Sequence, residues 1–106
     1  MPLALIPGDA ERPAIQYMLD ASLDLRAPVL ILPHHGGISS FAPELYDAVG
    51  AHLALVSNGP NPRYPAPRTR EALAMRGVRL IETNSAGQIT LRWKNPGDAP
   101  EIYVMR

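Results

Sequence analysis

Short apolar runs that alternate with amphipathic segments constrain the fold of this chain more than any other feature. A short apolar run closed by proline or glycine is typical of a buried strand, whereas apolar residues spaced by three and four are typical of a helix. Strands are predicted at residues 3–6, 28–33, 52–57, 78–83, 88–94 and 102–104, and helices at residues 10–22, 43–49 and 68–76. Strands joined by helices run parallel with right-handed crossovers, so the order predicts an α/β fold.

The last two predicted strands differ from the first four. In residues 88–94 the apolar Ile89, Leu91 and Trp93 alternate with polar residues, which is typical of a half-buried outer strand. A turn at residues 95–98 separates this strand from residues 102–104. We therefore expect a mostly parallel sheet, about three helices and a C-terminal antiparallel hairpin, all in a single domain spanning residues 1–106.

Composition excludes several classes of protein. Ten Lys and Arg residues balance ten Asp and Glu residues, so net charge gives no long-range attraction to nucleic acid or to an anionic membrane. The chain has no cysteine, which excludes disulfides and thiolate metal ligands and is consistent with the cytoplasm. No apolar run approaches the roughly 20 residues that cross a bilayer. The first strand begins almost at Met1, which indicates a truncated domain frame.

Polar residues follow each of the four predicted parallel strands. In chain order they are Asp9, then His34 and His35, then Ser57 and Asn58, then Thr83 and Asn84. The loops after parallel strands all emerge at one edge of the sheet, where α/β proteins place their sites. Neighbouring strands lie about 4.8 Å apart, so Asp9 and one of the two histidines could share a metal ion if their strands are adjacent. Any chemistry is expected at this edge.

Several of these residues have a structural interpretation as well as a functional one. Asp9 is placed to cap the first helix, and by itself the cap is the favoured interpretation. His34 and His35 lie between a strand-ending proline and two glycines, where they have little packing role. Imidazole is a common metal ligand, and the glycines would let the backbone approach a ligand closely. A loop histidine can equally face water, so both interpretations of the pair stay open.

Other polar residues favour the structural interpretation. His52 begins a strand alone and is expected to be a surface histidine or one whose hydrogen bonds are satisfied within the fold. Five arginines make residues 63–79 locally basic, but the interleaved aromatic residues of a single-strand nucleic-acid binder are absent, and Tyr64 alone is no stacking platform. Asn58 and Asn61 are turn formers or site-lining amides, with turn formers favoured.

Five sequence landmarks, in order, resemble one known family. Residues 32–37, Leu-Pro-His-His-Gly-Gly, are similar to the PHHGS signature of ComEC-type metallo-β-lactamase domains, and residues 5–11 are similar to its LLTGDIE segment. Residues 55–64 resemble the stretch ISVG.NNRYGHP, and residues 78–83 and 87–91 resemble the closing strands RVYRT and GAITI. The resemblance covers nearly the whole chain and identifies it as similar to the C-terminal half of that domain.

The resemblance implies a fold, a site and an activity. The fold is half of a metallo-β-lactamase αββα sandwich, with metal bound at the shared sheet edge. Asp9 would be the metal-bridging carboxylate, His35 a ligand, and His34 an outer-shell or alternative ligand. Gly8, Gly36, Asn58 and Tyr64 would line the site. The implied cofactor is a divalent metal, most simply zinc, and the implied activity is hydrolysis of a DNA phosphodiester by a metal-activated hydroxide during DNA uptake (competence).

Two departures from the family pattern limit that activity. The family's first metal motif, HxHxDH or HxDxDH, has no counterpart, and residues 63–68 lack the loop histidine of RYGHPHP. A catalytic zinc usually takes three protein ligands and keeps one open position. The resemblance therefore implies no catalytic residue within this chain, and we expect the 106 residues alone to be inactive.

Three hypotheses remain. In the first, the chain is the downstream part of a hydrolase, and an upstream half from the same gene or from another chain completes it. This hydrolase would lie in the cytoplasm or form a soluble domain of a membrane-attached uptake protein. The resemblance implies DNA as its partner. Alternatively, the chain is an inactive binding or structural module that dimerises through its sheet face, because residues 29–32 and 53–56 are apolar on both faces. A third is a small doubly wound domain for a phosphorylated ligand, disfavoured because Asp9 stands where phosphate needs N–H groups.

Overall fold

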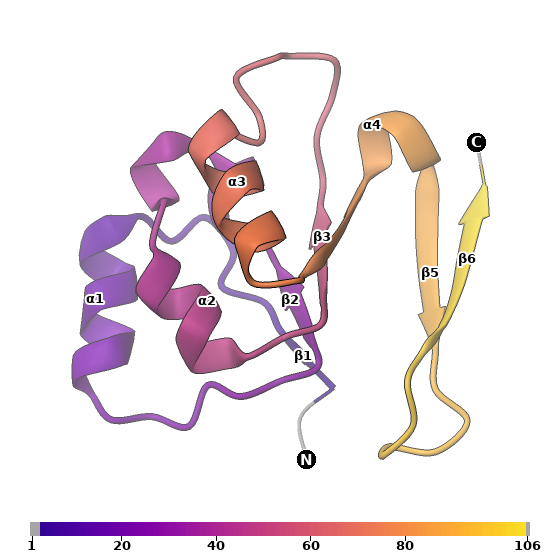
Figure 1. Cartoon of the computed structure of the whole chain (residues 1–106), viewed down its shortest axis with the longest axis horizontal. Helices are drawn as coiled ribbons and strands as arrows, with labels where there is room; N and C mark the ends of the chain where they lie inside the picture. Colours follow the sequence, from indigo (N-terminus) through magenta and orange to yellow (C-terminus); the bar gives the residue numbers. More distant parts are fainter. Residues whose placement is uncertain (1–2, 106) are drawn as a thin grey trace.

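A computed structural model describes residues 3–105 of the chain, and it places every predicted strand and helix in a two-part α/β arrangement (Figure 1). The elements are β1 (Ala4–Leu5), α1 (Arg12–Asp20), β2 (Val29–Ile31), the 3₁₀ turns η1 (Pro33–Gly36) and η2 (Ile38–Ser40), α2 (Pro43–Val49), β3 (Leu53–Val56), α3 (Pro67–Met75), β4 (Arg79–Glu82), α4 (Thr83–Ala86), β5 (Gln88–Arg92) and β6 (Glu101–Met105). The α/β prediction with a C-terminal hairpin is confirmed.

The first four strands form one parallel sheet in the order β1-β2-β3-β4. Because each crossover moves to the next strand in the same direction, right-handed connections place α1, α2 and α3 on one face of the sheet, as Figure 1 shows. The strands β5 and β6 pair antiparallel as a separate two-stranded sheet, with Ile89 opposite Val104. The hairpin stands on the side of the parallel sheet away from the helices.

Proline and glycine fix where the three longer helices begin and end. Pro13, Pro43 and Pro67 each occupy the first turn of a helix, where a missing N–H costs nothing. The helix α2 ends at Gly50, which adopts the left-handed conformation with φ of 61°.

The predicted capping role of Asp9 is wrong. Residues 7–10 form a turn closed by a 3.3 Å bond from the Ala10 amide to the Pro7 carbonyl, and the N-cap of α1 is Glu11. The helix therefore begins at Arg12, later than the predicted residue 10. The cause is local, because Ala10 already belongs to this turn and so cannot begin the helix. Asp9 is left exposed on this turn with no helical task.

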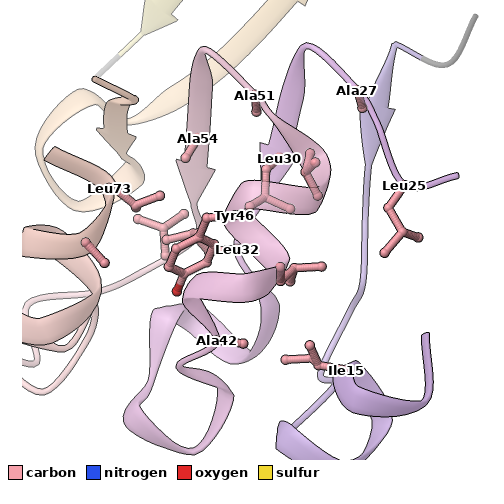
Figure 2. Packing of buried hydrophobic residues seen from close by; sticks show 14 residues of the cluster. Ile15, Leu25, Ala27, Leu30, Leu32, Ala42, Tyr46, Ala51, Ala54 and Leu73 are labelled. Carbon is pink, nitrogen blue, oxygen red and sulfur yellow. The ribbon is translucent and has the colours of Figure 1, made fainter. Parts of the chain in front are cut away.

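The core lies between the helices and one face of the parallel sheet. Figure 2 shows Ile15 of α1, Tyr46 of α2 and Leu73 of α3 packed against strand residues that include Leu30 and Ala54. Side chains in a strand alternate between faces, so Leu30 and Ala54 face the helices while Val29, Ile31, Leu53 and Leu55 face the other way. Burial of the first face supplies most of the stabilisation of the fold.

The opposite face of the parallel sheet is only partly covered. Val29 and Leu53 are buried, whereas Ile31, Leu55 and Ile81 are half-buried. The segment that leads into β6 passes near the first residues of β3 and β4, and together they enclose a cavity of about 320 Å³. This uneven cover agrees with the expectation that the helices leave one face of the sheet unsatisfied.

Candidate functional site

The loops after β1 and β2 meet at the carboxyl edge of the parallel sheet. The two strands are neighbours, with Leu5 paired to Leu30. The amide of His34 donates a 2.9 Å hydrogen bond to the carbonyl of Gly8, which joins the two loops directly. The turn that carries Asp9 and the loop that carries the two histidines therefore lie side by side, as the spacing of the sequence predicts.

The histidine loop has an unusual backbone. His34 and His35 both adopt the left-handed conformation, with φ of 49° and 56°, and Gly36 follows with φ of 74°. A residue with a Cβ pays roughly 1–2 kcal/mol for that conformation, although histidine tolerates it better than most residues. Such outliers cluster at functional sites, where surrounding contacts hold them. The predicted loop is thus a tight left-handed turn.

His35 is oriented by a backbone carbonyl. Its Nδ1 lies 2.6 Å from the carbonyl oxygen of Ser57, which follows β3. A carbonyl can only accept a hydrogen bond, so Nδ1 carries the proton and donates it. In the neutral form of such a ring Nε2 is bare, and it is the atom that can bind a metal ion or accept a proton. His35 is exposed, so solvent reaches the ring.

His34 is the more enclosed of the two histidines. Its Nδ1 is buried and has no hydrogen-bond partner within residues 3–105. The His34, His35 and Tyr64 rings form a cluster with centroid separations of 6.0–6.4 Å. Tyr64 thus packs against both imidazoles, and its predicted role as a site-lining residue stays a prediction.

The two glycines of the loop serve packing within the protein. A Cβ on Gly36 would lie 2.7 Å from Cβ of Pro65, and one on Gly37 would lie 2.9 Å from Cε1 of Tyr64. The Gly36 carbonyl also accepts bonds from the Ala66 amide at 2.9 Å and from the buried Thr69 hydroxyl at 3.1 Å. The interpretation that these glycines admit a ligand is corrected: what approaches them closely is the Tyr64–Pro65 loop.

Asn58 joins three segments at the rim of the sheet, by which we mean the loops that follow the parallel strands at their carboxyl edge. Its Nδ2 donates to the Tyr64 carbonyl at 3.3 Å and to Oε1 of Glu82 at 2.9 Å, and its Oδ1 accepts the Asn84 amide at 2.9 Å. Its backbone amide donates to the Thr83 hydroxyl at 2.9 Å, and that hydroxyl donates to the Asn58 carbonyl at 3.0 Å. Asn58 is therefore neither a simple turn former nor a free amide, because its polar groups hold the wall of the site.

Glu82 and Arg70 complete this wall, and no pattern in the sequence indicates their role. The Arg70 guanidinium donates to both carboxylate oxygens of Glu82, at 2.5 and 2.7 Å. These hydrogen bonds, and less strongly those from Asn58, hold the pKa of Glu82 below its usual value against the opposing effect of burial. A charged Glu82 thus anchors α3 to the end of β4.

A shallow cavity of about 320 Å³ opens at this rim, lined by His35, Ser57, Asn58, Gly59 and Tyr64. Three of these residues are predicted site residues, and the structure brings them together. Gly8 and Asp9 lie on the adjoining turn, and both are exposed. Gly36 lies behind His35 and is buried.

The donor set is small for a metal ion. Within residues 3–105, no group of three or more His, Asp or Glu side chains is placed to hold one together. The chemistry of the individual donors is suitable, because His35 has a bare Nε2 and His34 an unpartnered Nδ1. The residues present do not fit a complete catalytic site, which needs about three protein ligands. No metal-dependent reaction step is derived for this chain alone.

Several other charged or basic residues lie away from the rim or contact other residues of the chain. His52 is exposed at the opposite, amino-terminal edge of the sheet, as expected of a surface histidine. Arg76 pairs with Asp47 at 2.7 Å, and the Arg68 guanidinium stacks 4.7 Å from the Phe41 ring centroid. Three of the five arginines in the basic stretch, Arg68, Arg70 and Arg76, therefore contact other residues of the chain.

Comparison with known proteins gives two similar sequences. The chain is 29% identical over 101 residues to ComE operon protein 3 of Bacillus subtilis (strain 168), covering 93% of this chain and 13% of that protein. It is 31% identical over 96 residues to the uncharacterized protein YcaI of Escherichia coli (strain K12), covering 88% of this chain and 13% of that protein. The chain thus spans a small part of each relative.

The chain was also compared with protein-family profiles and with solved structures. No protein-family profile matches the chain, and no solved structure matches it. In the described part of the chain, every helix is too short or too polar to cross a bilayer.

Proposed function

We propose that this chain is the C-terminal part of a metal-dependent hydrolase domain that acts on DNA phosphodiesters during DNA uptake. The proposal extends the distant similarity to ComE operon protein 3 and the resemblance of residues 32–37 to the ComEC-type metallo-β-lactamase signature. In this proposal His35 and Asp9 supply part of a divalent-metal site, most simply for zinc, and His34 assists. The missing ligands belong to residues outside these 106, in a longer polypeptide or in another chain.

One observation carries the proposal. His35 is held in a strained left-handed turn with Nδ1 bonded to the Ser57 carbonyl, and this turn is joined to the Gly8–Asp9 turn by a backbone hydrogen bond. Metal-binding histidines in proteins commonly donate their second ring nitrogen to a carbonyl or carboxylate in this way. A merely solvated histidine gains little from such strain.

Zinc titration of the purified chain by calorimetry tests the metal site. We expect weak binding to the wild-type chain, a loss of at least about 10-fold in affinity in His35→Ala, and a smaller loss in Asp9→Ala. His52→Ala is the matched control, because it removes an exposed histidine from the opposite edge of the sheet. Equal affinities in the wild-type, His35→Ala and His52→Ala chains would remove the metal site from the proposal.

The hydrolase part of the proposal requires the missing ligands. We expect no DNA cleavage by the 106 residues with zinc alone, because an open-position site needs about three ligands. Cleavage of a DNA duplex is expected once an upstream segment with an HxDxDH motif is joined to residue 1. A joined protein that binds zinc as a complete site but leaves phosphodiesters intact would refute the substrate.

A second candidate function rests on the open sheet face. Ile31, Leu55 and Ile81, which face away from the helices, are only half-buried. Apolar area of this kind is stabilised by association, so an inactive module would dimerise or bind an upstream half here. Light scattering across a range of concentrations tests self-association. A monodisperse, stable monomer at every concentration would exclude the dimer.

A further inference from the structure

The Ser57 carbonyl places the proton of the neutral His35 ring on Nδ1, so the tautomer of His35 depends on what holds this carbonyl in place. The Ser57 carbonyl, 2.6 Å from Nδ1, belongs to an exposed residue just beyond the end of β3. An imidazole free in water favours the tautomer with the proton on Nε2. The bond to Ser57 selects the opposite tautomer, so its strength depends on how firmly this carbonyl is held.

The next residue along the chain provides that support. The backbone amide and carbonyl of Asn58 both bond to the Thr83 hydroxyl, at 2.9 and 3.0 Å. The bond from the Asn58 amide fixes the peptide plane that follows Ser57, because that nitrogen and the Ser57 carbonyl belong to the same planar unit, and the bond to the Asn58 carbonyl holds the next plane. The end of β3 is thereby clamped to the end of β4.

The Asn58 side chain strengthens the same clamp. Its amide group bonds to the Tyr64 carbonyl, to Glu82 and to the Asn84 amide, so both its oxygen and its nitrogen are engaged. Glu82 is in turn held by both nitrogens of the Arg70 fork. Tyr64 also packs against the His35 ring, with 6.0 Å between centroids. Asn58 therefore supports His35 on two sides: through the Ser57 carbonyl and through the loop that carries Tyr64.

We infer that Asn58 is a positioning residue that presets the tautomer of His35 and keeps its Nε2 bare. Asn58 does this without contacting the ligand of that nitrogen. The use of the bare nitrogen for metal rests on the proposed function, but the tautomer is a property of the chain alone.

Long-range ¹H–¹⁵N spectra of the metal-free protein, recorded at a pH where the rings are neutral, test the inference. The wild-type chain is expected to show His35 protonated on Nδ1. In Asn58→Ala the ratio of the Nδ1–H to the Nε2–H form is expected to fall by about fivefold or more, the population change expected when a typical neutral hydrogen bond is lost. Asn61→Ala is the matched control, because Asn61 lies in the same loop and bonds only locally, to the Arg63 amide at 3.0 Å. It should leave the tautomer unchanged.

A second pair of variants guards against loss of the fold in Asn58→Ala. Thr83→Val removes the hydroxyl that grips the Asn58 backbone, whereas Thr83→Ser keeps it. We expect the tautomer ratio to fall in Thr83→Val and to return in Thr83→Ser, with circular dichroism showing that both variants are folded. Folded Asn58→Ala and Thr83→Val proteins with wild-type tautomer ratios would overturn the inference.

The two proposals can fail separately. A tautomer that depends on Asn58 in a chain whose zinc affinity is unaffected by His35→Ala would leave the positioning role intact and refute the metal site. Conversely, zinc binding that depends on His35 with a tautomer indifferent to Asn58 and Thr83 would refute the positioning role alone.

Discussion

Gly36→Ala probes how closely the histidine loop is packed against its neighbour. The new Cβ would lie 2.7 Å from Cβ of Pro65 and 3.2 Å from its Cα, whereas carbon atoms normally rest about 3.5–4.0 Å apart. Relief requires the backbone of Pro65 or of the loop to move, since both near atoms belong to a rigid ring and chain. Gly36 also has φ of 74°, so alanine is strained there even without the clash.

Two other glycines separate the clash from the backbone strain. Gly50 and Gly77 have φ of 61° and 68°, and a Cβ at either meets no atom within 4 Å. Alanine at a positive φ costs roughly 1–2 kcal/mol, and the stiffer unfolded chain returns about 0.4–1 kcal/mol. Gly50→Ala and Gly77→Ala should therefore each lower the free energy of unfolding by about 1 kcal/mol. Overpacking adds about 1–3 kcal/mol at Gly36, for a total of about 2–4 kcal/mol.

Urea unfolding followed by circular dichroism measures all three variants. A domain of this size has a total free energy of unfolding on the order of 5–15 kcal/mol, so Gly36→Ala should shift the midpoint markedly and the controls only slightly. Because the clash lies beneath the site, we also expect the His35 and Tyr64 resonances to shift in Gly36→Ala alone. If Gly36→Ala is no less stable than Gly50→Ala, the close packing of the two loops is refuted.

Two further predictions concern the support of the site. Thr69→Val keeps the shape of a fully buried side chain but removes the hydroxyl that donates to the Gly36 carbonyl at 3.1 Å. Urea unfolding should therefore show a loss of about 1–2 kcal/mol in the free energy of unfolding. Thr90 is exposed, so Thr90→Val is the control, and an equal loss in the two variants would contradict a stabilising bond from Thr69. The pKa of Glu82 is lowered in the folded state, chiefly by its bonds to Arg70, so its stabilising contribution is present above the ordinary carboxyl pKa of 4.5 and is lost as pH falls through the lower folded value. Glu82→Gln should therefore reduce stability at neutral pH and flatten the decline in melting temperature below about pH 4.5, and an unchanged acid profile would show that the ion pair contributes nothing.

The alternation of parallel strands with helices, and the common sheet edge of the loops that follow the strands, could be predicted from the sequence because both follow from local patterns. An apolar run bounded by proline at both ends specifies β2, and a second apolar run specifies β3. The structure then places β1 beside β2, and so Asp9 beside the histidines. The boundaries were less predictable. The sequence predicts that the carboxylate of Asp9 caps the first helix. The helix instead starts at Arg12, because residues 7–10 form a separate turn before it.

The support of the site could not be predicted, since it depends on contacts between distant residues. Asn58 reaches Glu82 across 24 residues and the Asn84 amide across 26, and neither distance leaves a periodic trace in the sequence. The Gly36–Pro65 contact is equally non-local, so a glycine that serves packing looks the same in sequence as one that admits a ligand. The helical turn α4 also differs from the predicted simple turn, and its first two residues bond to Asn58.

The hydrogen bond from the His34 amide to the Gly8 carbonyl consists entirely of main-chain atoms. The bond needs no side-chain atom, so a substitution that tolerates the positive φ, 64° at Gly8 and 49° at His34, leaves the two loops joined. Proline at residue 34 is the exception, because it has no N–H and cannot adopt a positive φ. The side chains at this rim can therefore be replaced one at a time while the two loops that carry them stay joined.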